Sequence, residues 1–597
     1  MIDELYINNE KVDMGSSGVN LKFNSNILKD ISKVVSNNSY TINLPRTVRN
    51  ERILKVAGRP TRNDDFPRSI HTGKLYRDGF PIVESCNIHL LSIGSTIEIA
   101  LIWGNSQALA KLIDDGKNLN ELEGTSYDVT TWRDYEISDY GADEGFPGLL
   151  YADIDFGLKS GETEAFIHPS VRASYIFEKL EQAYGLKVSI PEGRKEMYEH
   201  LIFPLTSRNG GKANAIEGEW RGSVFYDAKF NASLPYSYLN FDTIYSATKV
   251  DEFIELVQTY LGIEYGFKIK SFKAKRNGKA WILPDFSCKT DTIFVGRVEG
   301  KDVTNYGYLE AENQGDGYYR YNAELTFDIS EGDEFYIIEV GRTEFSFINK
   351  AITVRLIPEE IKKGDFFSLV DNLPPIKTTD YIKTICNVLG LYVSSVGDNL
   401  VLTEFEKLED NKAFAKDWSD KMMGEAENIS FQLSDFAQRN YLRYKEDDAV
   451  GMTFGGVVKV ADKWLDAEGV LSELKFAGSL NNGGRAVVKL YSYNDKGELE
   501  YEDTTPRILL EADNNGKARG VFQGLSFAEL VPKFYYTYQS IVFMPVVIKA
   551  KFRLNASDVR GMDMAVPIYL KQFGKFYVIK EGILDNDNIF EVELIQM

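Results

Sequence analysis

Two aspartates in the segment YADIDF are spaced so that both carboxylates fall on one face of a predicted strand. Asp153 and Asp155 are two residues apart, and alternate residues of a strand point to the same side. A glycoside hydrolase uses two carboxyl groups about 5 to 10 Å apart, so the pair is one candidate catalytic site. The other interpretation is a solvated strand face, because 89 acidic residues make such pairs common by chance. We favour the second interpretation.

The other residues that often carry catalysis occur without a motif. The sequence has no GxxxxGK[ST], HExxH, GxSxG or GxGxxG pattern, the patterns typical of phosphate, zinc, nucleophile and dinucleotide sites. The four histidines stand alone in the sequence: His71, His89, His168 and His200. The three cysteines are far apart and lack metal-ligand spacing, so we expect buried apolar side chains: Cys86, Cys288 and Cys386. We therefore predict a protein that is not an enzyme, with no catalytic, cofactor-binding or metal-ligating residue and no cofactor.

Four further segments each admit more than one interpretation. Asp513–Gly516 and Asp585–Asn588 faintly resemble calcium loops but lack the spaced ligands and the terminal glutamate, so we interpret both as turns. Phe267–Lys275 (FKIKSFKAK) alternates lysine with apolar residues. It fits a phosphate-contacting strand, or, as we favour, an edge strand whose lysines oppose aggregation. The tyrosine-rich segment Tyr306–Tyr321 fits sugar stacking, a subunit interface or half-buried strands.

The elements that position these residues include a helix followed by a hairpin between Thr378 and Phe405. Thr378 or Thr379 is a candidate helix cap, apolar residues then recur at helical spacing, and Gly390 is placed to end the helix in the left-handed conformation. Leu391–Ser395 and Leu400–Phe405 follow as two strands around Gly397-Asp398. We predict that Gly390→Val lowers stability by about 1 kcal/mol or more.

The same helix–glycine–strand cassette recurs in weaker form. His168-Pro169-Ser170 precedes Ala173, Ile176, Leu180 and Ala183, and Gly185-Leu186-Lys187-Val188-Ser189 ends the segment. The helical part of the cassette recurs a third time, as a third helical echo from Thr248 to Gly262. This segment has the candidate cap, the apolar spacing and the final glycine. Such helix–glycine–strand joints are common in proteins, so one interpretation of the recurrence is coincidence. The alternative interpretation is that the chain contains two related β-rich domains.

Length and composition set the class of protein. A chain of 597 residues exceeds one hydrophobic core, so several domains are expected. The net charge of −21 disfavours a general nucleic-acid binder, whose affinity comes from lysine and arginine. The start, MIDELYINNE, is not of the secretory-signal type, and Ile541–Ile548, the longest apolar run, is too short to span a bilayer. Synthesis in a cytoplasm is the expectation.

We predict a mainly β fold with a few short helices, in five segments. They are an N-terminal barrel-like domain with the first cassette (1–209), an inserted β-sandwich-like domain (210–345), a second barrel-like domain with the central cassette (346–450), a second β-sandwich-like tract (451–565) and C-terminal strands returning to the second barrel-like domain (566–597).

Several segments of the sequence resemble segments of tail and baseplate hub proteins of bacteriophages. The similar segments lie at both ends and in the middle: YINNEKVDM, SNILKDISKVVSNNSYTINLPRTVRN, LYRDGFPIV, IEIALIWGN, NLPPIKTTDYIKTICNVLGLYV, KDWSDKM, AQRNYLRYK and VPIYLKQFGKFYVIKEGIL with FEVELIQM. The tracts 210–345 and 451–565 are less constrained by the resemblance.

The resemblance implies a structural virion protein made in the bacterial host cytoplasm. Such hubs have two barrel-like domains of similar fold, and three copies form a ring that joins the tail tube to a distal spike or fibres. The implied partners are further copies of the chain, other tail and baseplate proteins, and spike or fibre proteins. DNA would be transit cargo only, through a channel whose negative charge repels phosphate. The alternative function is a glycan-binding or glycan-hydrolysing β-sandwich protein.

Overall fold

The structure is a computed structural model of the whole chain. It describes residues 2–15, 18–28, 37–55, 69, 71–104, 112–124, 129–131, 133–134, 141–143, 146–159, 166–208, 216–228, 236–247, 254–260, 268–289, 291–299, 302–340, 348–358, 366–396, 399–433, 436–447, 454–560 and 562–597. The sequence also predicts brief helices at Asn26–Val35 and Ser106–Asp114. Most of both helices, and the Gly397-Asp398 turn, lie outside these residues. The fold class is confirmed, because strands dominate and the helices are short.

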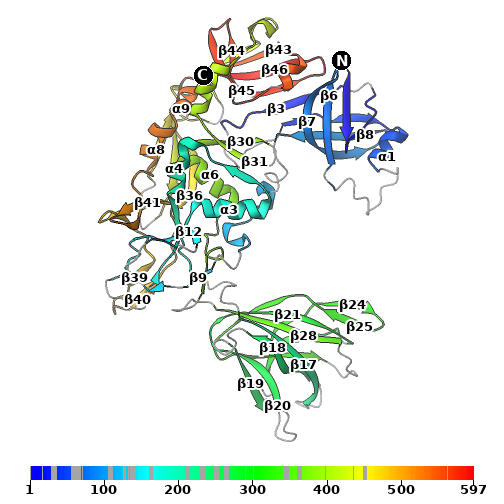
Figure 1. Cartoon of the computed structure of the whole chain (residues 1–597), viewed down its shortest axis with the longest axis vertical. Coiled ribbons are helices and arrows are strands. Elements are labelled where there is room, and N and C mark those ends of the chain that lie inside the picture. The colour runs from blue at the N-terminus through cyan, green and yellow to red at the C-terminus, as the bar shows by residue number, and fades with distance from the viewer. Residues whose placement is uncertain are drawn as a thin grey trace.

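A 14-stranded sheet joins the two ends of the chain (Figure 1). Its strand order is β2-β1-β6-β7-β8-β4-β3-β45-β46-β43-β33, with β5 on β8 and β44 linking β32 to β45. The strands are β1 Asp3–Ile7, β2 Glu10–Lys11, β3 Leu21–Asn24, β4 Asn37–Ser39, β5 Ile42–Pro45, β6 His71–Arg77, β7 Phe80–Ile93, β8 Thr96–Trp103, β32 Lys416–Asp417, β33 Asn428–Ser430, β43 Val547–Arg553, β44 Ile568–Leu570, β45 Lys575–Leu584 and β46 Ile589–Gln596. Among the described residues this order is an open path, so the expected barrel-like shape is not a closed barrel.

Alternating apolar residues explain this sheet. Ile97, Ile99 and Leu101 are buried in β8, and each is separated by a residue that faces outward. The Asp78-Gly79 pair between two apolar segments predicts a hairpin turn, and the structure confirms it, because both residues have positive φ between β6 and β7. The short helix α1 (Val48–Ile53) follows β5 and begins at a Thr47 cap.

The buried Arg77 fixes the two chain ends to each other. Its guanidinium donates to both carboxylate oxygens of Asp3 (2.7 and 3.1 Å) and to the Val19 carbonyl (2.6 Å). It also donates to the Asp585 carbonyl (2.7 Å) and to Oδ1 of Asn588 (3.0 Å) in the turn before β46. The side chain is fully buried, and every N–H has an acceptor, as burial of a charge demands.

A second core gathers helices and small sheets from the middle of the chain. It contains α3 Ala173–Tyr184, α4 Glu192–Glu199, α6 Thr378–Leu389, α7 Glu406–Asp410, α8 Phe527–Phe534 and α9 Tyr536–Phe543, while α10 Ala556–Arg560 packs on β7. One sheet has the order β11-β12-β14-β16-β41-β42 (Gly141–Asp143, Phe146–Tyr151, Ser170–Arg172, Leu201–Pro204, Leu509–Asn514, Lys517–Val521), another β15-β31-β30 (Lys187–Ser189, Asn399–Glu404, Leu391–Val396), and a third β35-β34-β36 (Gly456–Lys459, Arg439–Lys445, Glu468–Ala477). Two-stranded pairs join β9 Val129–Thr131 to β29 Phe366–Ser368, β10 Arg133–Asp134 to β13 Phe166–Ile167, β37 Asn481–Asn482 to β38 Arg485–Ala486, and β39 Tyr491–Tyr493 to β40 Leu499–Tyr501.

The tract 451–565 differs from the predicted sandwich. Its strands are shared among several sheets, and it includes α8 and α9. The helix α8 begins at Ser526, whose hydroxyl accepts a hydrogen bond from the Ala528 N–H. Its buried residues recur at helical spacing: Phe527, Leu530, Val531 and Phe534. The sequence pattern of this segment is therefore helical, although turn signals flank it on both sides.

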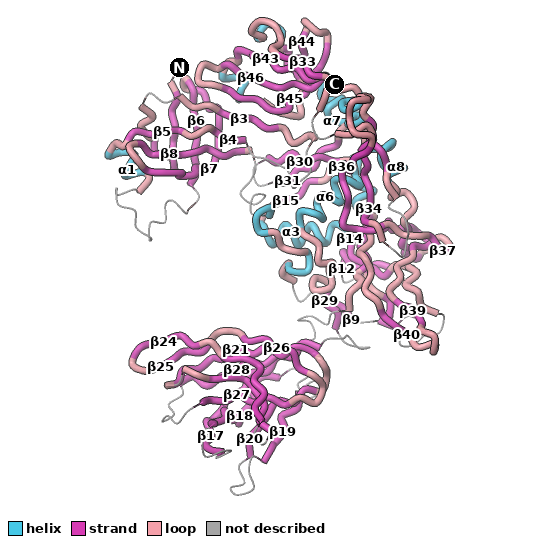
Figure 2. The backbone as a smooth tube through the Cα atoms, turned by 180° about the vertical axis from the view of Figure 1, so that it is seen from behind, coloured by secondary structure: helices cyan, strands magenta, loops and turns pink. Residues whose placement is uncertain are grey.

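A separate β unit occupies residues 216–358 and has its own core (Figure 2). Its order is β19-β20-β27-β18-β17-β28-β21-β25-β24, with β22, β23 and β26 attached. The strands are β17 Ile216–Ala228, β18 Tyr236–Ala247, β19 Ile254–Tyr260, β20 Lys268–Ala274, β21 Gly278–Cys288, β22 Ile293–Glu299, β23 Asp302–Tyr308, β24 Ala311–Gly315, β25 Tyr318–Tyr321, β26 Leu325–Ile329, β27 Glu334–Val340 and β28 Ile348–Pro358. Its last strand extends beyond the predicted boundary at residue 345.

Two predictions for this unit are wrong. The third helical echo, Thr248–Gly262, contains the strand β19, because its β-branched and aromatic residues suit a strand and β20 pairs with it along its length. The lysine-rich β20 is not an edge strand. It pairs with β19 on one side and, at Phe272 and Lys273, with β27 on the other.

Candidate functional site

The central cassette folds largely as predicted. The helix α6 buries Tyr381, Ile382 and Ile385, and Gly390 ends it with φ +61°. The predicted threonine cap is wrong, because the cap position is Lys377 and Thr378 is already helical. The Thr378 N–H bonds to the Lys117 carbonyl instead of to a side-chain cap.

The two cassettes form one junction instead of lying in separate cores. The first cassette gives α3 and Gly185, also left-handed at φ +65°. Its strand β15 pairs in parallel with β31 of the second cassette, with Val188 opposite Leu400. The Tyr381 hydroxyl donates to the Ala173 carbonyl (2.9 Å). The resemblance between the cassettes is therefore accompanied by direct pairing.

Arg194 on α4 holds this junction at the end of α6. Its Nε donates to the Leu389 carbonyl (2.8 Å), the last residue of α6, where a cation is favoured by the helix dipole. Its Nη2 lies 2.9 Å from the Glu406 carboxylate, and the guanidinium carbon lies 4.0 Å from the centre of the Phe534 ring. The arginine thus joins four segments that are distant in sequence.

The structure brings the Asp153 and Asp155 carboxylates into contact with arginines. Arg485 lies 3.1 Å from Asp153, and the Nε of Arg519 lies 3.6 Å from the same carboxylate. Asp155 accepts hydrogen bonds from the Asn482 amide (2.6 Å) and the Gly157 N–H (3.0 Å). Both carboxylates therefore connect the chain after β12 to segments near residues 482–519, and the predicted solvated face is partly buried.

His168 is a fully buried histidine whose two ring nitrogens are both bonded. Nδ1 lies 2.8 Å from the Leu205 carbonyl, which only accepts, so Nδ1 carries the proton. Nε2 then accepts from the Tyr491 hydroxyl at 2.8 Å. Burial lowers the pKa of His168 to about 3, so the ring stays neutral and stabilises the core.

We predict that replacing His168 with Gln reduces the acid sensitivity of the fold. Between pH 6.5 and about 3 only the unfolded chain protonates this group, so its contribution to stability is complete above pH 6.5 and falls as the pH is lowered. The loss is about 1.4 kcal/mol per pH unit in that range. Urea unfolding at pH 7, 6 and 5 should therefore show the wild type and the variant converging.

The matched control is His200→Gln, since the His200 side chain is exposed and its Nδ1 lies 2.8 Å from the nearby Glu196 carbonyl. It should retain the slope of the wild type. Parallel curves for wild type and His168→Gln would contradict the prediction.

The other candidate groups serve structure. All three cysteines are buried free thiols, and burial raises the pKa of Cys86 to about 12. In the described part of the chain no group of three or more His, Cys, Asp or Glu side chains is arranged to hold a metal ion. Asp513 accepts a bond from the Gly516 N–H in the β41–β42 turn, and Asp585 accepts from the N–H groups of Asp587 and Ile589. Both segments are turns, as predicted.

The tyrosine-rich segment consists of partly buried strands, as in the third of its interpretations. Tyr321 is buried in the core of the inserted unit, and Tyr306 stacks on Phe327 at 4.8 Å between ring centres. Tyr308 is the large apolar side chain of this segment that is exposed.

A cluster of exposed apolar side chains lies at the β33 end of the large sheet. We name it the β33 patch; its members are Ile429, Phe431, Trp464, Phe543 and Met544. Trp464 is 93% exposed. Contacts hold the segments together: Gln432 donates to Asp462, which also accepts from the Trp464 N–H, and the Ala461 N–H bonds to the Phe543 carbonyl. β33 pairs with β43 on one side and ends the strand order on the other.

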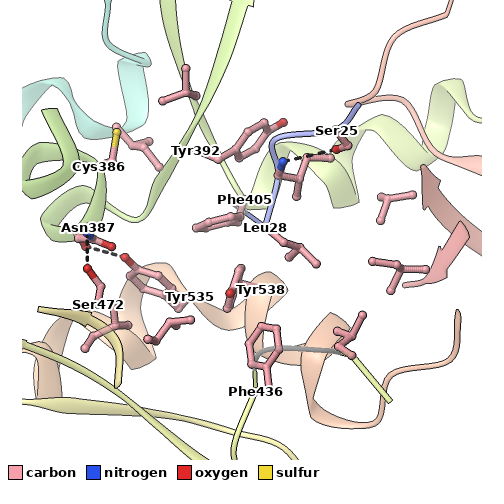
Figure 3. Close-up of a pocket in the computed structure, with 18 of the residues that line it drawn as sticks. Ser25, Leu28, Cys386, Asn387, Tyr392, Phe405, Phe436, Ser472, Tyr535 and Tyr538 are labelled. Atoms are coloured by element: carbon pink, nitrogen blue, oxygen red, sulfur yellow. Dashed lines mark hydrogen bonds between the residues drawn. The ribbon is translucent and has the colours of Figure 1, made fainter. Parts of the chain in front are cut away.

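A cavity of about 320 Å³ lies beside the cassette junction (Figure 3). Residues from α6, β30, β36, α9, β45 and the segment after β3 line it. Asn387 donates to the Ser472 hydroxyl (3.0 Å) on one wall, and its carbonyl accepts from Tyr535 (2.7 Å). Sequence reasoning missed this cavity and the β33 patch because their residues come together only through long-range strand pairing.

Comparisons with known proteins leave the family open. No protein-family model and no curated protein sequence matches the chain. Among solved structures, the 43 kDa tail protein of prophage MuSo2 from Shewanella oneidensis aligns with 99% of this chain and 97% of its own, at 6% identity and a TM-score of 0.32. Murine APRIL aligns with 24% of this chain and 98% of its own, at 7% identity and a TM-score of 0.18. Eiger TNF from S. frugiperda covers 25% of this chain and 96% of its own, at 9% identity and 0.15. At these TM-scores none of the three establishes a common fold or function. Within the described residues no helix is long and apolar enough to span a membrane.

Proposed function

We propose that the chain is a structural virion protein of a bacteriophage tail. In this role it acts as the tail or baseplate hub, joins the tail tube to the distal spike or fibres, and lines the channel for DNA. The sequence resemblance at both ends and in the middle of the chain motivates the family. The net charge of −21 suits a channel that repels DNA phosphates.

The observation that carries an assembly role is the β33 patch. Monomeric proteins rarely leave large apolar side chains clustered, and such clusters mark interfaces. Here the cluster adjoins β33, which lies at the edge of the sheet formed by the described residues, and an edge strand can pair with another chain. In this role further copies of the chain or neighbouring tail proteins cover the β33 patch, and no catalytic step takes part.

Mass photometry of the purified chain tests this proposal. We expect trimers or rings, and we expect Trp464→Asp to shift the population to monomers, because a charge in an apolar interface is costly. Phe414→Ser is the control, since Phe414 is similarly exposed outside the patch. Persistent monomers at high concentration would contradict the hub.

The glycan alternative is distinguished by the two aspartates. Asp153→Asn with Asp155→Asn should leave assembly unchanged in a hub but abolish turnover in a hydrolase that uses them. Polysaccharide hydrolysis by the wild-type chain that both substitutions remove would overturn the structural role.

A further inference from the structure

The cavity beside the cassette junction has the size and the walls of a small-molecule site. Its volume of about 320 Å³ lies within the range of roughly 300 to 1,000 Å³ typical of ligand pockets. Apolar side chains form most of the wall, among them Leu28, Leu391, Phe405 and Phe436. Such a wall accommodates an alkyl chain or ring and excludes charged groups from the middle of the cavity.

One polar atom on this wall lacks a partner. Tyr392 is 3% exposed, and its hydroxyl is buried without a hydrogen-bond partner in the described part of the chain. Burial, and to a lesser extent the Asp563 carboxylate, raises the pKa of Tyr392, so the hydroxyl keeps its proton and is a donor. A buried donor with no acceptor is unfavourable, and a ligand oxygen placed there would satisfy it.

Two lysines are the charged residues that line the cavity, and the ammonium of one of them, Lys580, pairs with the Glu593 carboxylate at 2.8 Å. The residues that line the cavity include Lys383 and Lys580 and no aspartate or glutamate. The Ser25 N–H bonds to the Lys580 carbonyl (3.0 Å), so these two residues adjoin. Figure 3 shows the Tyr392 phenol extending toward Ser25, while Asn387 and Ser472 lie at another side of the cavity. The donors that this end offers to a ligand are therefore the Tyr392 and Ser25 hydroxyls, beside the Lys580–Glu593 ion pair.

We propose that this cavity binds a small amphipathic carboxylate of the medium-chain fatty-acid class. The alkyl chain lies against Leu28, Phe405 and Phe436, and the carboxylate accepts the Tyr392 hydrogen bond near Lys580. The site is separate from the β33 patch and does not depend on the tail role.

Calorimetric titration of the full chain with decanoate, decyl alcohol and acetate tests the proposal. We expect saturable one-to-one binding of decanoate and at least tenfold weaker binding of decyl alcohol and acetate, because each lacks either the charge or the chain. Tyr392→Phe keeps the ring and removes the donor. It should weaken decanoate binding at least tenfold while the melting temperature of the unliganded chain stays equal or rises.

Two further variants separate the cavity from adsorption to the surface. Val470 lines the cavity and is 53% exposed, so Val470→Trp should block the entrance without disturbing the core and abolish binding. Lys383→Met, beside Asn387, should leave the affinity within about twofold of the wild type. Absence of saturable binding, equal affinity for decanoate and decyl alcohol, or unchanged affinity in Tyr392→Phe would overturn the proposal.

Discussion

A Gly390→Val variant is expected to lose about 3 kcal/mol or more of unfolding free energy, from left-handed strain and overpacking together. Gly390 has φ +61°, a conformation that costs a residue with a Cβ about 1–2 kcal/mol. A Cβ at this position would also lie 2.4 Å from the Cβ of Phe534 and 2.8 Å from its carbonyl oxygen. Because the carbonyl is backbone, α8 would have to move. Denaturant unfolding measured by circular dichroism checks the value.

The other cassette provides the matched control. Gly185 has nearly the same φ, +65°, but a Cβ there meets nothing within 4 Å. Gly185→Val should therefore cost only the strain, about 1–2 kcal/mol. Equal losses in the two variants would show that the contact with Phe534 does not constrain the helix end.

The second large effect is expected at Arg77. Arg77→Met removes five hydrogen bonds and leaves the buried Asp3 carboxylate without its cation. Breaking a buried ion pair from one side costs about 3–5 kcal/mol. Thermal unfolding and hydrogen exchange in β1 and β46 should both report the loss, because the guanidinium joins Asp3 to the turn at Asp585 and Asn588.

Arg52→Met is the control for this variant. Arg52 is 69% exposed and pairs with Glu10 at 2.7 Å, so the change should be within about 0.5 kcal/mol. The double variant Asp3→Leu with Arg77→Met should recover part of the loss, since it leaves neither charge unpaired. An Arg77→Met protein as stable as Arg52→Met would refute the role assigned to the guanidinium.

Local features of the fold were predictable from the sequence. The spacing of apolar residues before Gly390 and Gly185 gave both helices, and the Asp78-Gly79 pair gave a hairpin. These features depend on residues within a few positions of one another. The local pattern predicted the wrong structure where strand pairing determines the conformation. In Thr248–Gly262 the spacing predicts a helix, but antiparallel pairing with β20 makes the segment contain a strand.

Features that depend on distant segments were not predictable. The parallel pairing of Val188 with Leu400 brings the cassettes into one core, and no local pattern specifies it. The acceptors of Arg77 include groups more than 500 residues away in sequence. The candidate cavity needs α6, β36, α9 and β45 in place before it exists. The Asp153 and Asp155 pair was visible in the sequence, but its arginine partners were not.

The pairing of β3 with β45 has a consequence for biosynthesis. Leu21 faces Leu584 across this pair, so the large sheet is incomplete until β45 has left the ribosome, long after β3. Contacts between distant segments form slowly, and an unpaired edge invites association with other nascent chains. Emergence of β45 is thus the event that lets β3 and the strands beside it find their permanent neighbour.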